Sequence, residues 1–164
     1  MFYDEVFRIL NKKRVRYVVA GGMAVVLHGF ARFTADLGII LHLEERNIDR
    51  FFDALHELGY NPQVPVTREQ FKDRTSRAEW ISRKGMVVFS FLHPREHLKA
   101  IDVFIEEPMT FGTLAKNAKR IRVEDLSIPV ISLRHLMRLK KKAGRPQDAI
   151  DLANLKEIQK LTKR

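Results

Sequence analysis

Residues 19–40 read VAGGMAVVLHGFARFTADLGII, and this stretch decides the fold. The β-branched and aromatic run over residues 14–20 predicts a strand, and Gly21-Gly22 ends it. A short helix is expected next, over residues 23–28, and a second strand over residues 36–43. Glycines after a strand let backbone N–H groups approach an anionic ligand, and the start of a following helix adds positive potential. A Gly-Gly pair alone indicates no more than a turn, so its meaning depends on the rest of the chain.

Apolar spacing predicts further elements on both sides of this stretch. Ser132 is a suitable N-cap for a helix, Gly144 suits the position just after its end, and Pro146 suits the first turn of another helix. Residues 60–77 are polar and contain two prolines, which predicts an irregular, mobile loop. The expected elements are helices over 2–13, 45–59, 132–142 and 146–161, and strands over 86–92, 99–105, 121–123 and 128–131. This order predicts an α+β or mixed α/β fold, with a small mixed sheet flanked by helices and a C-terminal helical cap.

Length and composition favour one globular domain over residues 1–164, with a sheet-containing core in 1–131 and helices in 132–164. The sequence has no cysteine, which excludes disulfides and thiolate metal sites. No apolar run is long enough to span a bilayer, and acidic Asp4 and Glu5 do not suit a signal peptide, so we expect a cytoplasmic protein without a membrane partner. The net charge of +10 favours polyanionic partners such as nucleotides or nucleic acid.

Three separated motifs carry a resemblance to a known family. The first comprises Gly21, Gly22, Ala24, His28, Gly29, Arg32, Thr34, Asp36 and Leu37. The second is Asp102 within Ala-Ile-Asp-Val-Phe, and the third comprises Lys140, Gly144, Arg145, Pro146, Asp148, Asp151 and Leu152. Together they resemble the nucleotidyltransferase superfamily, in particular its minimal and abortive-infection toxin-type members. The resemblance covers most of the chain, although residues 45–85 add nothing diagnostic.

The resemblance implies transfer of a nucleoside monophosphate from a nucleoside triphosphate (NTP), such as ATP, to an acceptor. Two Mg²⁺ ions would clamp the attacking and leaving oxygens. It implies that Asp36 and Asp102 are catalytic metal ligands, and that the nucleotide-binding residues are Gly21, Gly22, Arg32, Thr34 and Lys140. The acceptor would be a hydroxyl or phosphate on RNA, a protein or a small molecule. Membership of a toxin–antitoxin pair would make RNA or a partner protein the target.

The sequence departs from this pattern at position 38, where Gly38 stands in place of the second aspartate of an Asp-x-Asp pair. Three explanations are open: a variant of an active enzyme, a natural pseudoenzyme that still binds nucleotides, or a slow enzyme with one metal ion held by Asp36 and Asp102. We therefore expect impaired chemistry with partly retained triphosphate binding. The alternative is a catalytically inactive module that binds nucleotide, RNA or a protein. A plain nucleic-acid binder, inferred from charge alone, is a third option.

Several motif residues have a structural alternative. His28 is expected to be packed and hydrogen-bonded, and Arg32 and Thr34 could orient the loop before Asp36 instead of touching substrate. We expect Arg145, Asp148 and Asp151 to form an inter-helix salt-bridge and capping set, and the basic run along 134–145 could be a solvated face or a wall beside the triphosphate. The segment His93–His97 spells the zinc motif H-x-x-E-H. It includes Pro94 and connects two predicted strands, so we expect no zinc site there.

Overall fold

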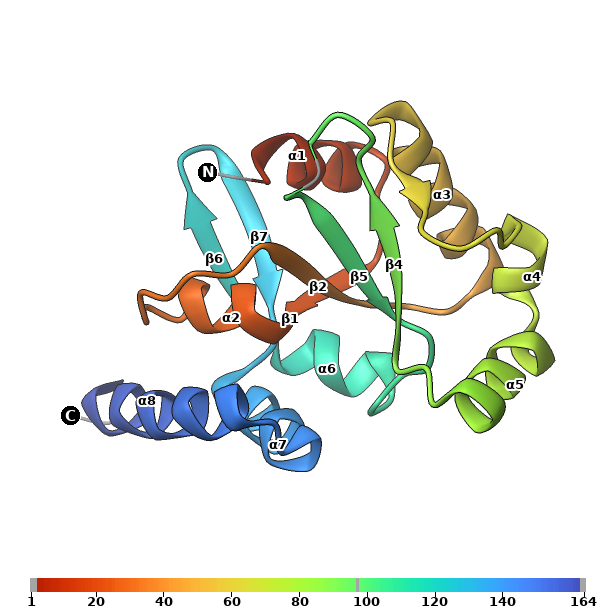
Figure 1. The fold of residues 1–164 in the computed structure, drawn as a ribbon. Coiled ribbons are helices and arrows are strands. Elements are labelled where there is room, and N and C mark those ends of the chain that lie inside the picture. Colours follow the sequence, from red (N-terminus) through yellow and green to blue (C-terminus); the bar gives the residue numbers. More distant parts are fainter. Residues whose placement is uncertain (1–2, 97, 163–164) are drawn as a thin grey trace.

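The computed structural model describes residues 3–96 and 98–162. A seven-stranded mixed sheet, ordered β3-β4-β5-β2-β1-β7-β6, runs through the molecule and is flanked by helices (Figure 1). The strands are β1 (Tyr17–Ala20), β2 (Asp36–Leu41), β3 (Asn61–Pro62), β4 (Val88–Leu92), β5 (Ala100–Phe104), β6 (Lys119–Val123) and β7 (Leu126–Val130). The helices are α1 (Asp4–Lys12), α2 (Gly21–Leu27), α3 (Glu45–Glu57), α4 (Arg68–Lys72), α5 (Arg74–Lys84), α6 (Phe111–Asn117), α7 (Leu133–Ala143) and α8 (Pro146–Thr162). The predicted mixed α/β architecture with C-terminal helices is confirmed. None of the described helices has the length and apolar character needed to cross a membrane.

Strand β2 lies at the centre of the sheet, antiparallel to β1 and parallel to β5. Gly38 is paired with Ala20 on one side and with Asp102 on the other. Because side chains alternate between the two faces of a strand, Asp36, Gly38 and Asp102 share one face. The alternate residues Leu37, Ile39, Ile101 and Val103 are fully buried on the opposite face. The register therefore separates an acidic face from an apolar one along the same two strands.

Helices α3, α4 and α5 cover the apolar face through a cluster of aromatic side chains, and Figure 1 shows these helices grouped beside β4. The Phe71 ring lies 5.4 Å from that of Phe52 and 5.7 Å from that of Phe89. Trp80 of α5 stacks on Phe89 at 5.9 Å. Buried aromatic side chains of this kind contribute large amounts of apolar burial. The cluster fixes α4 and α5 against the sheet.

The prediction of an irregular loop over 60–77 was wrong, because this stretch contains β3, α4 and the start of α5. Thr67 and Gln70 form a reciprocal capping box at the start of α4, and the Asp73 side chain accepts hydrogen bonds from two backbone N–H groups of α5. Phe71 is the single buried residue of α4 and Arg77 that of α5, so neither helix shows an apolar stripe in the sequence. Helix α6 was also not predicted. The backbone N–H of Phe111, the first residue of α6, donates a hydrogen bond of 2.8 Å to the side chain of Glu107, which lies before the helix.

The first strand begins at Tyr17, later than predicted, and Arg14 before it has φ 55°. Local signals near the C-terminal helices were more reliable. Ser132 accepts a hydrogen bond from the backbone N–H of His135 and caps α7, and Gly144 follows α7 in the left-handed conformation with φ 64°. Pro146 then opens α8, as predicted. The expected first helix is confirmed over α1, while Phe2 lies outside the described residues. Helices α7 and α8 pack on each other, and α7 contacts α2.

Candidate active site

A cavity of about 310 Å³ lies between the acidic face of β2 and β5, the start of α2 and the junction of α7 with α8. Seven predicted site residues line it: Gly21, Gly22, Arg32, Thr34, Asp36, Asp102 and Lys140. Gly38 lines it as well, together with Val88, Phe104, Arg145, Gln147 and Asp148, which were not among the predicted site residues. The volume is at the lower end of the range for small-molecule sites. Residues separated by more than 100 positions in the chain therefore converge on one concave surface.

Two carboxylates define one wall of this cavity. Asp36 is the first residue of β2, and Asp102 lies in the middle of β5. The Ser90 hydroxyl, on β4 opposite Asp102, donates a hydrogen bond of 2.6 Å to the Asp102 carboxylate. Burial and the nearby charge of Asp36 raise the pKa of Asp102, although the Ser90 hydrogen bond and the charge of Arg145 oppose this rise. The two carboxylates are thus close enough to repel each other.

Tyr3 and Ser90 support this wall, and neither was identified from the sequence. The buried Tyr3 hydroxyl lies against the carbonyl oxygen of Ala35 and 2.9 Å from that of Ala100. Ala35 precedes Asp36, and Ala100 is its register partner on β5, so Tyr3 secures the start of β2. Ser90 had a readable signal, because it is a polar residue inside the apolar run 86–92. Its contact with Asp102 required the β4–β5 register.

The two glycines permit close packing at the start of α2. Gly21 has φ 65°, a conformation that glycine adopts without strain. A Cβ atom added to Gly22 would lie 2.6 Å from the Thr34 hydroxyl oxygen and 3.0 Å from an Arg32 terminal nitrogen. The segment before Asp36 therefore packs directly against Gly22. These contacts agree with the loop-orienting alternative for Arg32 and Thr34.

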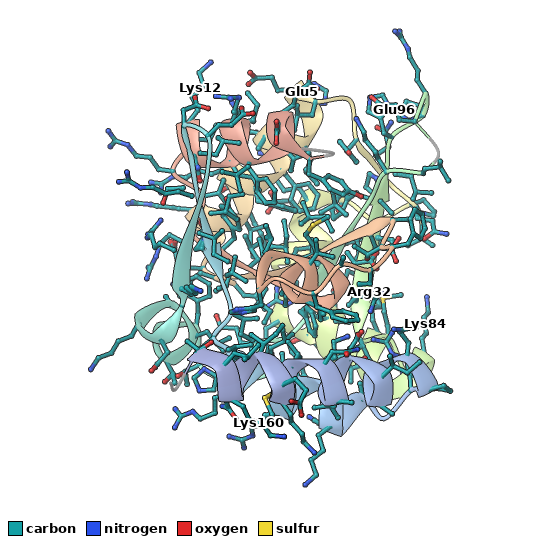
Figure 2. All side chains as sticks on the ribbon, turned by 90° about the vertical axis from the view of Figure 1, so that its left-hand side faces the viewer. Glu5, Lys12, Arg32, Lys84, Glu96 and Lys160 are labelled. Atoms are coloured by element: carbon teal, nitrogen blue, oxygen red, sulfur yellow. The ribbon has the colours of Figure 1, made fainter. Side chains whose placement is uncertain are left out.

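Lys140 sits in a buried network of charges at the base of the cavity. Its ammonium nitrogen lies 2.9 Å from Asp148 and 2.6 Å from Asp151, and its side chain is 5% exposed. Arg32 reaches the same Asp151 carboxylate at 2.6 Å. Figure 2 shows Arg32 between α2 and the C-terminal helices. The network links the segment before β2 to both α7 and α8.

Hydrogen bonds in this network lower the pKa values of its two carboxylates, Asp148 and Asp151. Burial alone would raise the pKa of Asp148, but hydrogen bonds from Arg145 and Lys140 outweigh it and hold the pKa at about 2. Burial likewise opposes ionisation of Asp151, yet hydrogen bonds from Lys140, Gln147 and Arg32 lower its pKa. Both carboxylates are charged at neutral pH. The predicted salt-bridge and capping role of Arg145, Asp148 and Asp151 is confirmed.

The donor set fits one Mg²⁺ ion, and it does not fit a two-ion site with three carboxylates. Mg²⁺ in such sites is held by one or two carboxylates, with phosphate oxygens and water completing its shell. Asp36 and Asp102 could supply two ligands, and no group of three or more potential ligand side chains occurs among residues 3–96 and 98–162. A Cβ added to Gly38 would lie 3.1 Å from the carbonyl oxygen of Ala20. A further ligand at this position would therefore require the β1–α2 turn to shift slightly.

Two histidines, His28 and His93, have structural roles. His28 is buried and its Nε2 donates a hydrogen bond of 2.7 Å to the carbonyl oxygen of Ile131, which confirms the structural alternative for this residue. The His93 Nδ1 accepts hydrogen bonds from the backbone N–H groups of Arg95 and Glu96 and so stabilises the connection between β4 and β5. His97 of the H-x-x-E-H motif lies outside the described residues.

A larger cavity of about 510 Å³ lies between α5 and the ends of β2 and β5, and no predicted site residue lines it. Arg77 lines this cavity, but one of its guanidinium nitrogens donates hydrogen bonds to the carbonyl oxygens of Phe71 and Lys72. Arg77 therefore satisfies the last carbonyl groups of α4, which is a structural role. The smaller cavity, with its carboxylates and glycine turn, is the candidate active site.

Several solved structures are similar to this chain in fold. The protein resembles a lincosamide antibiotic adenylyltransferase, LnuA, in its lincomycin-bound structure, with a TM-score of 0.62 and 20% identity over 94% of this chain and 96% of that one. It resembles a putative nucleotidyltransferase from Thermotoga maritima, with a TM-score of 0.58 and 16% identity over 98% and 90% of the two chains. An antigenic nucleotidyltransferase-like protein from Paracoccidioides brasiliensis gives a TM-score of 0.57 and 14% identity over 96% and 77%.

These structures share the nucleotidyltransferase fold with this chain, as the resemblance of its motifs implied. No curated protein sequence matches it. The model of the aminoglycoside-2''-adenylyltransferase family matches residues 4–155, which include every residue of the candidate active site. The chain therefore belongs to the aminoglycoside-2''-adenylyltransferase family, within the nucleotidyltransferase superfamily.

Proposed function

We propose that this protein transfers a nucleoside monophosphate, with AMP from ATP as the first candidate, to a hydroxyl group of a small molecule. The observation that carries the proposal is the convergence of Asp36 and Asp102 with the glycine turn on one cavity. Family membership supports nucleotidyl transfer as the reaction, and the family description favours adenylyl as the group transferred.

The proposed reaction is a displacement at the α-phosphorus of the triphosphate. The acceptor oxygen forms a bond to this phosphorus, the bond from the phosphorus to the bridging oxygen of the β-phosphate breaks, and pyrophosphate leaves. Asp102 accepts the hydroxyl proton, because it lines the cavity and the hydrogen bond from Ser90 fixes its position. Asp36 and Asp102 would hold one Mg²⁺, which supplies positive charge to the phosphates.

The other lining residues would position the triphosphate. Gly21 and Gly22 leave the backbone accessible because they carry no side chain. Arg32 and Thr34 would form the edge of the nucleotide site. Lys140 would contribute through the charge network at its base, because its ammonium group is bonded to Asp148 and Asp151.

The acceptor is proposed from the known proteins. The family description names an aminoglycoside, and LnuA was solved with lincomycin, so small molecules that carry several hydroxyl groups are the first acceptors to test. RNA and protein, which the toxin-type resemblance implies, form the second set of acceptors.

The test is pyrophosphate release with each of four NTPs and Mg²⁺, in the presence of aminoglycosides, lincomycin or bulk RNA. Mass spectrometry would identify the product by the mass of an added nucleotide. We expect ATP-dependent release with a small-molecule acceptor, and loss of release in Asp102→Asn. Release that persists undiminished in Asp102→Asn would refute the proposed site.

Gly38 favours a second candidate function, in which the protein binds an NTP without turning it over. Gly38 supplies no third carboxylate, and a side chain there would be crowded by the Ala20 carbonyl oxygen, 3.1 Å from an added Cβ. This candidate predicts Mg²⁺-dependent ATP binding by calorimetry with no pyrophosphate release for any acceptor. Turnover that depends on Asp102 would exclude it.

A further inference from the structure

Lys140 is the cation that the motif assigns to the triphosphate, but its charge is already balanced. Two ionised carboxylates, Asp148 and Asp151, lie within 2.9 Å of its ammonium nitrogen. An ammonium group has three N–H donors, and two of them are directed to these carboxylates. Moving Lys140 toward a ligand would leave two buried carboxylates without this partner, which is costly.

Arg145 is placed differently, although it belongs to the same network. Its side chain is 72% exposed and lines the cavity that holds Asp36 and Asp102. Its Nε donates to Asp148 at 2.8 Å and one terminal nitrogen donates weakly at 3.4 Å. A guanidinium has five N–H donors in a planar fork, so most of the outer edge of Arg145 is directed to solvent.

The Arg145 guanidinium lines the same cavity as Asp36 and Asp102, and Asp148 holds it on its other side. The Arg145 backbone N–H also donates to Asp148 at 3.2 Å, between Gly144 in its left-handed conformation and the first residue of α8. Asp148 therefore fixes both the main chain and the side chain of Arg145. A cation restrained in this way loses less conformational freedom when it binds an anion.

The charges of the network leave Arg145 as the available cation. Lys140, Arg32 and Arg145 supply three positive charges, and Asp148 and Asp151 supply two negative ones. Arg32, with a side chain 18% exposed, is committed to Asp151, so the surplus positive charge is presented at Arg145.

We propose that Arg145 contacts the phosphates of the bound NTP, and that Lys140 is a positioning residue that acts through Asp148. The proposal rests on the proposed function, because it assigns the triphosphate of that reaction to the wall formed by the α7–α8 junction. A planar guanidinium can give two parallel N–H···O bonds to one phosphate, which a lysine ammonium cannot.

The test is calorimetric titration with ATP, inorganic tripolyphosphate and adenosine, in the presence of Mg²⁺. Arg145→Ala should weaken binding of ATP and tripolyphosphate by about tenfold or more, since a charge-assisted hydrogen bond contributes about 1.5–3 kcal/mol. Affinity for adenosine should stay the same. Arg145→Lys should recover part of the loss. Arg138→Ala, which removes one exposed charge from α7 outside the cavity, is the matched control and should bind like the unmodified protein.

Lys140→Met tests the positioning role. It should lower the thermal midpoint more than Arg145→Ala does, because Lys140 is paired with two buried carboxylates and Arg145 with one. At a temperature where circular dichroism shows the variant to be folded, it should weaken tripolyphosphate binding less than Arg145→Ala does. Tripolyphosphate binding by Arg145→Ala at the unmodified affinity would overturn the inference and leave the proposed function standing. Absence of any ATP or tripolyphosphate binding by the unmodified protein would overturn both.

Discussion

Gly38 determines how much chemistry this active site can support. Its Cα lies so close to the β1–α2 turn that an added Cβ would meet the Ala20 carbonyl oxygen at 3.1 Å and the Gly21 Cα at 3.5 Å. These neighbours are backbone atoms, which cannot rotate away as a side chain can. Glycine at this position therefore allows β2 and the turn to approach each other. Restoring an aspartate is a steric change as well as an electrostatic one.

We expect Gly38→Ala to destabilise the protein by about 1–2 kcal/mol, because it forces a shift in a closely packed turn. Gly38→Asp should cost more without Mg²⁺, because it adds a third carboxylate beside Asp36 and Asp102. Mg²⁺ should raise the thermal midpoint of Gly38→Asp more than that of Gly38→Ala, the control with the same Cβ. Thermal unfolding with and without Mg²⁺ makes this comparison. A Gly38→Asp variant as stable as the unmodified protein without metal would show that the turn has room for the side chain.

At the level of single residues, the sequence predicted which residues line the cavity better than it predicted their burial and packing. Asp36, Asp102 and the glycine pair were found from motifs, and the missing carboxylate at Gly38 was visible directly. The sequence did not show whether Lys140 would be an exposed cation or one buried between Asp148 and Asp151, because its burial depends on how α7 packs against α8. The close approach of Ala20 to Gly38 depends on strand register, for which one sequence offers no local signal.

A buried network of charges joins helices α7 and α8. Asp151 has no exposed side-chain surface and accepts hydrogen bonds from Arg32, Lys140 and Gln147. The same carboxylate thus holds the segment before β2, α7 and α8 together. Breaking a buried ion pair by removing one partner is far more damaging than breaking an exposed one.

We expect Asp151→Asn to lower the free energy of unfolding by about 3–5 kcal/mol, because the buried Lys140 and the partly buried Arg32 each lose a charged partner. Glu157→Gln is the matched control on the same helix. Glu157 pairs with Lys160 at 2.7 Å, but both side chains are about two-thirds exposed, and its loss should cost less than about 1 kcal/mol. Urea unfolding followed by circular dichroism measures both. Similar costs for the two variants would mean that the network contributes no more than a surface pair.

Strand β6 is the outermost strand of the sheet on one side, and its exposed positions carry Lys119, Arg120 and Arg122. Figure 2 shows side chains with nitrogen at their tips projecting from this side of the molecule. Positive charges on an edge strand oppose pairing with the edge of a second molecule. This gives part of the basic surface a role that requires no polyanionic partner.

Replacing Lys119, Arg120 and Arg122 together by threonine should therefore promote self-association. The reason is that the edge keeps its unpaired backbone groups but loses its repulsive charge. Size-exclusion chromatography with light scattering over a range of concentrations measures this. The control replaces three exposed basic residues of α7, Arg138, Lys141 and Lys142, by threonine and makes the same change in net charge. Equal masses for the two variants at every concentration would contradict the prediction.

Elements whose ends are set by neighbouring residues were predicted well. Ser132, Gly144 and Pro146 bound the last two helices by local backbone chemistry, which a sequence displays directly. Helices α4 and α5 were missed because their stability comes from Phe71 and Trp80, which pack on residues of β4. Their capping residues, Thr67 and Asp73, were readable, but the polar composition and prolines of 60–77 favoured a loop. Long-range burial outweighed that local composition.

At the scale of the whole molecule, stability should respond to pH through two buried histidines. Burial lowers the pKa of His28, and the charge of Lys119 lowers it further, although a hydrogen bond to the Ile131 carbonyl opposes the shift. Burial also lowers the pKa of His135, with Arg134 and Arg138 acting in the same direction. Both residues are less than 10% exposed. The folded protein therefore keeps both rings neutral at a pH where the unfolded chain would protonate them.

The direction of the pH effect follows from these lowered pKa values. The unfolded chain, with histidine near its ordinary value of 6.5, binds protons before the folded protein does. The stability from the neutral rings is present above about pH 6.5 and is lost as the pH falls toward the folded-state values. The free energy of unfolding in urea should therefore be lower at pH 5.5 than at pH 7.5. His28→Gln with His135→Gln should reduce this difference, whereas His56→Gln, at an exposed position on α3, should preserve it. An equal loss of stability in the double variant and the unmodified protein would assign the pH dependence to other groups.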